Sequence, residues 1–264
     1  ELLPRLTLMP GYTTLNEFLN QGLAPGQGDS QLKLGAVKIV LDESSGSLYP
    51  PQQELFEIVL RAHKAGYQVA IHAIDTVDAA ATALEYALVK YPRPHRHRIE
   101  HCSVCPPETL NRLSKLGVIV VTQPPFLYYS GERYLSEVPK HQLSWLYRIK
   151  SFKEAGLRPA ASSDSPVAPN NPLVGIYAAV TRKAETGEAI LPEEAISPYE
   201  ALVMYTTAPA YANFEESEKG FISPGKMADI VILNNDPTRV PYELIKNIKV
   251  EMTILGGEVV WGGL

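Results

Sequence analysis

The chain has 264 residues, of which 45% are hydrophobic and 20% are charged, a composition typical of globular proteins. Its formal net charge of -5 gives no reason to expect nucleic acid or an anionic membrane surface as a partner. No apolar run approaches the roughly 20 residues of a membrane-spanning helix, and the two cysteines are too few for a disulfide framework. We therefore expect a globular protein of a reducing, cytoplasmic setting.

Six short apolar runs, taken in chain order, are predicted to be strands that alternate with helices. Helical stretches end at Gly66, Gly117 and Gly156, and each glycine is followed by an apolar run of strand length. Glycine suits the left-handed residue that ends many helices. Repeated helix, glycine and strand is typical of an α/β fold built around a parallel sheet. The predicted strands lie near residues 5–9, 36–42, 68–73, 98–102, 118–123 and 158–163.

The chain changes character near Pro198. Ser197, Pro198 and Glu200 form the pattern of a capped helix start, with proline at the first helical position and glutamate three residues after the cap.

Two later segments are predicted to be antiparallel strands. They cover residues 225–235 and 249–263, and the second folds back on itself at a Gly-Gly turn. We therefore predict two parts, an α/β body over residues 1–212 and a small β element over residues 213–264.

Four polar side chains interrupt strands that should be almost wholly apolar. Lys38 lies inside its strand, His72 and His101 lie near the ends of theirs, and Asp164 follows the last one. Functional groups of parallel barrels gather at the carboxyl ends of strands. Because imidazole and carboxylate suit zinc and similar divalent ions, the set indicates a metal-dependent hydrolase site.

Each of the four residues also has a structural interpretation. A single histidine at a strand end is more often hydrogen-bonded than a metal ligand. Lys38 could pair with Asp42 or Asp164, and an aspartate in the stretch SSDSP suits a turn. The combination of four suitable residue types on different strands favours the metal site.

Strand alternation predicts which side chains share a face. It places Lys38 and His72 opposite the apolar face of their strands. If His101 points the same way, Arg98 and Glu100 are expected to face the helices.

His95 and His97 form a His-x-His pair at the entry of the strand that ends at His101. At about 3.3 Å per residue, His97 lies roughly 13 Å from His101, toward the opposite end of the sheet. We therefore assign the pair to a polar loop and not to the metal site.

Cys102 and Cys105 have the C-x-x-C spacing of redox and zinc sites. A redox or zinc module is thus an alternative function. In a thioredoxin-type motif the cysteines lie at the start of a helix, whereas here two prolines separate them from the next predicted helix. We predict that Cys102 is a small buried residue and that Cys105 belongs to a loop.

With these residues, the chain resembles the amidohydrolase superfamily of metal-dependent hydrolases, most closely its amidohydrolase-3 (YtcJ-like) branch. The resemblance implies a TIM-type (β/α)8 barrel with a small β-sandwich. About six strands are present, and the family's N-terminal part with its His-x-His strand is missing, so we expect an incomplete barrel whose open edges allow homo-oligomers. The matching stretches are LKLGAVKIVLD, GYQVAIHAI, HRIEHC, AASSDSPVAPNNPLVGIYAAVTRK, SPYEALVMYTTAPA and GFISPGKMADIVILNNDP.

The resemblance also implies roles for the four polar residues. His72, His101 and Asp164 would ligate one or two divalent ions, with zinc expected, and Lys38 would be a carbamylated bridging ligand. Asp164 would also be the general base for the attacking water. The implied reaction is hydrolysis of a non-peptide C–N bond, in an amide or cyclic amide of small size. The alternative is a truncated, catalytically incomplete barrel fragment without activity of its own.

Overall fold

The computed structural model describes residues 4–263, which divide into two compact units. The first comprises Glu1–Val121 and Ala155–Leu157, and the second comprises Thr122–Glu154 and Arg158–Leu264. The division predicted at residue 212 stays a prediction.

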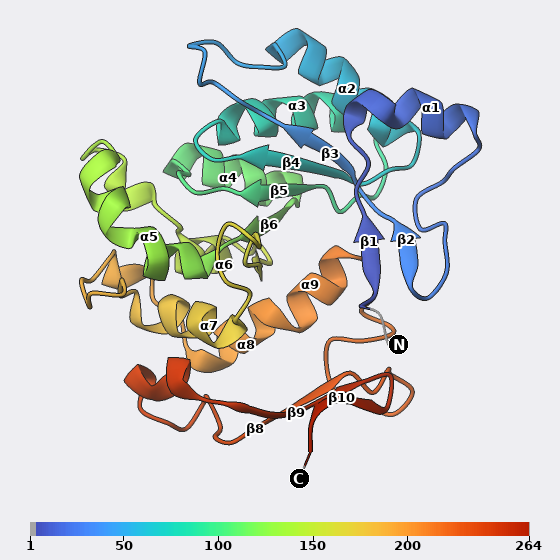
Figure 1. Cartoon of the computed structure of the whole chain (residues 1–264). Coiled ribbons are helices and arrows are strands. Elements are labelled where there is room, and N and C mark those ends of the chain that lie inside the picture. The colour runs from blue at the N-terminus through green and yellow to red at the C-terminus, as the bar shows by residue number, and fades with distance from the viewer. Residues whose placement is uncertain (1–3, 264) are drawn as a thin grey trace. The chain divides into compact units, whose positions relative to one another are not determined.

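A parallel sheet forms the centre of the first unit (Figure 1). Its neighbouring strands are, in order, β3 (Val37–Val40), β4 (Val69–Ala73), β5 (Arg98–His101) and β6 (Ile119–Thr122). One buried apolar side chain from each of the four strands lies beside its counterpart on the next strand, so that together they form a row across the sheet. The row consists of Ile39, Ile71, Ile99 and Val120.

Three helices follow the strands of this sheet in the chain. Helices α2 (Gln52–Lys64) and α3 (Val77–Lys90) pack against each other and against β4, and α4 (Pro107–Leu116) packs on α3 (Figure 1). The chain before the sheet forms β1 (Leu6–Leu8), η1 (Tyr12–Thr14), α1 (Leu15–Asn20) and β2 (Leu32–Leu34), and β1 pairs with β2 in parallel.

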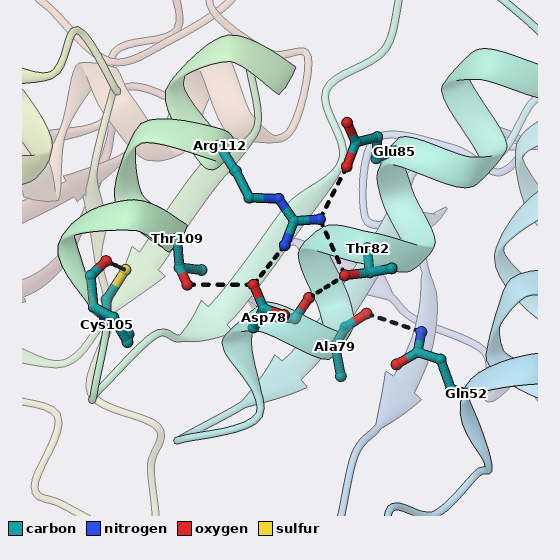
Figure 2. A network of polar contacts seen from close by, with 9 residues as sticks. Gln52, Asp78, Ala79, Thr82, Glu85, Cys105, Thr109 and Arg112 are labelled. Carbon is teal, nitrogen blue, oxygen red and sulfur yellow. Dashed lines mark hydrogen bonds and ion pairs between the residues drawn. The ribbon is translucent and has the colours of Figure 1, made fainter.

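Arg112 fastens α4 to α3 (Figure 2). Its guanidinium donates to the carboxylate of Asp78, to Thr82 Oγ1 at 3.0 Å and to Glu85 Oε2 at 2.9 Å. Thr109 Oγ1 also donates to Asp78 Oδ1, at 3.4 Å. The network orders two neighbouring helices, although such partly exposed ion pairs contribute little stability each.

The second unit is mainly helical, with its apolar core around α7 (Pro172–Thr181) and α8 (Pro198–Tyr205). A three-stranded antiparallel sheet follows them in the chain, and its order is β10 (Glu258–Gly262), β9 (Val250–Leu255), β8 (Ile230–Leu233). Its elements are α5 (Pro124–Glu137), η2 (Leu143–Trp145), α6 (Ile149–Glu154), β7 (Ala160–Ala161), α7 (Pro172–Thr181), η3 (Pro192–Glu194), α8 (Pro198–Tyr205), α9 (Thr207–Ala212), β8 (Ile230–Leu233), η4 (Tyr242–Asn247), β9 (Val250–Leu255) and β10 (Glu258–Gly262).

Most of the predicted elements are confirmed. All six predicted strands are present, although β7 has only two residues, and β2 was not predicted. Gly66, Gly117 and Gly156 have φ of 89°, 66° and 82°. Ser197 and Glu200 form both hydrogen bonds of a capping box. Within residues 4–263, no helix combines the length and apolar character needed to cross a membrane.

Candidate functional site

The side chains of His72 and His101 meet in the first unit. Their strands, β4 and β5, are neighbours, and their ring centroids are 4.4 Å apart at an interplanar angle of 70°. His101 is 5% exposed, whereas His72 is half-buried. Two imidazoles from separate strands therefore converge near the carboxyl ends of those strands, as the sequence predicts.

The backbone of His101 explains how its ring reaches His72. His101 has φ of 71° and Cys102 has φ of 52°, a left-handed conformation that is uncommon for residues other than glycine. In an extended strand, the residue after Glu100 would point to the opposite face. The turn of the chain at His101 breaks this alternation. Backbone of this kind often marks functional sites.

The prediction that Arg98 and Glu100 face the helices is therefore wrong. The register places Glu100 directly beside His72 and Arg98 beside Ala70, so both share the face of His72. Arg98 Nε lies 2.6 Å from Glu100 Oε1, and Arg98 Nη2 donates to Met9 Sδ at 3.1 Å. A carboxylate held by an arginine thus adjoins the histidine pair.

Lys38 lies on the same face of the sheet. It is half-buried and pairs with Ala70, while His72 pairs with Val40. Lys38 is thus two residues deeper in the sheet than His72, and not level with it at the strand end.

Asp42, the first alternative partner of Lys38, forms hydrogen bonds within its own loop. Its carboxylate accepts hydrogen bonds from Ser44 N at 2.8 Å and from Ser44 Oγ at 2.9 Å. These bonds lower the pKa of Asp42, and the nearby His72 lowers it further by a smaller amount.

Asp164 belongs to the second unit. Since β7 ends at Ala161, Asp164 lies three residues beyond it and not at the end of a longer strand. It is exposed, it has φ of 55°, and its carbonyl accepts a hydrogen bond from Val167 N at 2.9 Å. The turn suggested by SSDSP is confirmed, and the role of Asp164 as a ligand stays a prediction.

His97 is fully buried and forms part of a chain of hydrogen bonds. Val69 N donates to His97 Nδ1 at 3.0 Å, so the proton of the neutral ring is on Nε2. This nitrogen lies 2.8 Å from His63 Nδ1, and His63 Nε2 lies 2.7 Å from the carbonyl oxygen of Tyr91. Both histidines are then Nε2-protonated, and each nitrogen has a partner.

His95 completes this group by stacking on His97, with ring centroids 4.7 Å apart. His97 is excluded as a metal ligand by its hydrogen bonds as well as by its position in the sheet, because both of its ring nitrogens already have hydrogen-bond partners. Both histidines lie in the loop before β5, as predicted, and within that loop the ring of His97 is buried. Its partner His63, on α2, could not be found by reading the strands alone.

Cys102 and Cys105 are both buried, free thiols. Burial raises the pKa of Cys102 well above its usual value, and the neighbouring Cys105 raises it further. Cys105 Sγ also donates to Pro106 O at 3.8 Å. Because the thiolate is the form that reacts and binds metal, these properties disfavour the alternative of a redox or zinc module.

The histidine pair fits part of a divalent metal site. Imidazole is a good ligand for zinc, and neighbouring strands hold these two rings together. Over residues 4–263, no group of three or more histidine, cysteine, aspartate or glutamate side chains comes together as a metal-binding cluster. The described residues therefore bring together two imidazole rings of a type that suits a metal, with Lys38 on the same face of the sheet.

Comparison with known proteins adds the decisive observation. The model of the amidohydrolase family matches residues 7–261. The chain belongs to the amidohydrolase family. It is 27% identical over 253 residues to YtcJ of Bacillus subtilis (strain 168), a protein named as an amidohydrolase. This match covers 87% of the chain and 47% of YtcJ.

Two further proteins resemble this amidohydrolase-family chain. The N-substituted formamide deformylase of Arthrobacter pascens is 29% identical over 217 residues, covering 80% of the chain and 40% of the enzyme. The crystal structure of an uncharacterized metal-dependent hydrolase from Pyrococcus horikoshii OT3 matches with a TM-score of 0.78 and 26% identity, covering 90% of the chain and 52% of that structure. The chain thus spans about half the length of these relatives, and its mixed α/β fold with a parallel sheet is consistent with a TIM-like barrel.

Proposed function

We propose that this chain acts as a metal-dependent amidohydrolase that cleaves a non-peptide C–N bond in an amide or cyclic amide of small size. The contact between the rings of His72 and His101 carries the proposal, because it brings two zinc-type ligands together from neighbouring strands. The printed name of the Arthrobacter pascens relative supports an amide as the substrate class. The free, buried cysteines support a cytoplasmic setting.

The proposed ligands are His72 and His101, together with Asp164 and a carbamylated Lys38, around one or two divalent ions, of which zinc is expected. Such an ion, when bound, lowers the pKa of its water and polarises the scissile carbonyl. The side chains of the protein supply the remaining functions. The two imidazoles supply nitrogen ligands, and Asp164 accepts the proton of the attacking water.

Glu100 and Arg98 are expected to support His72. Carboxylates near a ligating histidine commonly fix its orientation and raise its basicity. Glu100 pairs with His72 in the register, and Arg98 balances its charge inside the half-buried sheet face.

We also propose that the chain supplies about six strands of a TIM-type barrel over residues 1–212 and part of a small β-sandwich over residues 213–264. The spans matched in the relatives, about half of their lengths, support an incomplete barrel.

A second candidate is a barrel fragment without activity of its own. Two observations favour it. The chain spans 47% of YtcJ, and among residues 4–263 no group of three or more histidine, cysteine, aspartate or glutamate side chains comes together as a metal-binding cluster.

Zinc binding by the purified chain separates the two candidates. Under the first, zinc raises the melting temperature, and His72→Ala or His101→Ala removes most of this rise, because two of the proposed ligands come from these rings. His141→Ala is the control, since His141 is exposed and outside the first unit. Metal analysis without bound divalent ion, together with no thermal shift on adding zinc, would leave only the second candidate.

A further inference from the structure

Gln123 occupies a constrained position directly after β6. It is 1% exposed and precedes Pro124 and Pro125, the first two residues of α5. Two prolines fix the following backbone, and burial restricts the side chain. The amide of Gln123 is therefore held in a single direction by elements on both sides of it.

This amide is directed at the segment that leads to Asp164. Gln123 Nε2 donates to Ser162 Oγ at 2.9 Å. One residue earlier, the carbonyl of Thr122 accepts a hydrogen bond from Ser162 N, also at 2.9 Å. A backbone bond and a side-chain bond thus attach Ser162 to the end of β6, entirely within the second unit.

Asp164 lies two residues after Ser162, and its backbone has a conformation that neighbouring contacts must stabilise. Its φ of 55° lies in the left-handed region, which costs a residue with a Cβ about 1 kcal/mol. Ser165 N donates to Ser163 Oγ at 3.2 Å, and Val167 N donates to Asp164 O at 2.9 Å. The turn is therefore fastened after Asp164 by its own bonds and before Asp164 by the bonds of Ser162.

We propose that Gln123 is a positioning residue for Asp164, acting through the hydroxyl of Ser162. The inference rests on the proposed function, in which the carboxylate of Asp164 is a metal ligand. An exposed carboxylate has little packing of its own, so the backbone of its turn sets its direction. Ligand geometry must hold to within about 0.5 Å for tight binding, and the contact from Gln123 to Ser162 supplies this restraint.

Calorimetric titration of the full chain with zinc tests the inference. Gln123→Ala and Ser162→Ala are each expected to weaken zinc binding about tenfold, the effect of losing one partly buried hydrogen bond. Ser162→Thr keeps the hydroxyl and is expected to keep the wild-type Kd. In an Asp164→Asn background, Gln123→Ala is expected to change the Kd no further, because it acts through Asp164. Gln142→Ala, a half-buried glutamine of the same unit, is the matched control.

The outcomes separate this inference from the proposed function. Weaker binding in Asp164→Asn with an unchanged Kd in Gln123→Ala overturns the inference alone. An equal loss from Gln123→Ala in the wild-type and Asp164→Asn backgrounds indicates general damage and also overturns it.

Absence of zinc binding by the wild-type chain overturns the proposed function, and hydrogen exchange then decides the inference. Gln123→Ala is expected to speed exchange of the Ser162 and Val167 amides about tenfold relative to Gln142→Ala. Unchanged exchange rates overturn the positioning role.

Discussion

At the scale of single residues, His63 and His97 of the first unit are held as neutral rings. Burial is the main cause that lowers the pKa of His97 well below its usual value, and the neighbouring His95, His63 and Arg93 lower it further. Burial also lowers the pKa of His63. A second proton on His97 would leave Nδ1 facing the N–H of Val69, two donors against each other.

This arrangement predicts a loss of stability in mild acid. The unfolded chain takes up protons on its histidines below about pH 6.5, whereas the native chain resists them, so the free energy of unfolding falls as the pH falls. The expected slope is about 1.4 kcal/mol per pH unit for each excluded proton. Urea unfolding between pH 7.5 and pH 5 measures it.

His97→Gln is expected to flatten this pH dependence, because an amide can accept from Val69 and donate to His63 without titrating in this range. The exposed His141 offers the control, and His141→Gln is expected to keep the wild-type slope. A slope that is the same in all three proteins would contradict the prediction.

Tyr205 differs from these histidines, because its buried hydroxyl oxygen lacks a hydrogen bond among the described residues. Among residues 4–263, its hydroxyl finds no hydrogen-bond partner, and burial raises the pKa of this phenol. We expect Tyr205→Phe to leave stability unchanged or to raise it by about 1 kcal/mol, because an unsatisfied buried hydroxyl is costly. The free energy of unfolding in urea measures the change.

Tyr147 is the matched control for this substitution. It is 1% exposed, and its hydroxyl lies 3.2 Å from that of Tyr134. Tyr147→Phe is expected to lower stability by about 1 kcal/mol. A loss of that size in Tyr205→Phe instead would mean that the Tyr205 hydroxyl has a partner in solution.

At the scale of elements, the sequence predicts what local patterns determine. The glycines that end helices and the capping box at Ser197 depend on neighbours within a few residues, and the structure confirms them. The strands of the sheet are found for the same reason, since runs of buried apolar residues mark them. The three-residue strand β2 lacks such a run, because Leu32 is exposed and Lys33 follows it.

The candidate site is less predictable because its geometry depends on distant partners. The meeting of His72 with His101 depends on a left-handed residue that no periodic pattern reveals. The burial of His97 depends on His63, which lies 34 residues away on a helix. Residue types therefore identify candidate ligands, while backbone conformation decides which of them meet.

The capping box of α8 provides a test at this scale. Ser197 Oγ accepts from Glu200 N, and Glu200 Oε2 accepts from Ser197 N at 2.8 Å. We expect Ser197→Ala to lower the free energy of unfolding by about 1 kcal/mol. Ser136→Ala, which removes an exposed serine hydroxyl within α5, is the control and is expected to change it by less than about 0.5 kcal/mol. Equal effects of the two substitutions would argue against the cap.

At the scale of the whole molecule, the last strands expose an unusual amount of apolar surface. Strand β10 is at one edge of its sheet, and its Val259, Val260 and Trp261 are 53%, 41% and 57% exposed. Unpaired edges with apolar side chains promote pairing with another chain. The relatives are about twice as long as this chain, so the matched segment is not their complete structure.

We therefore expect the isolated chain to self-associate through β10. Sedimentation velocity over a hundredfold range of concentration should show a rising mean mass. Val259→Lys is expected to suppress this rise, because a charge at an edge strand opposes pairing. Val89→Lys is the matched control, since Val89 is 73% exposed on α3, outside this sheet. Association that persists in Val259→Lys, or that Val89→Lys abolishes equally, would assign the contact to another surface.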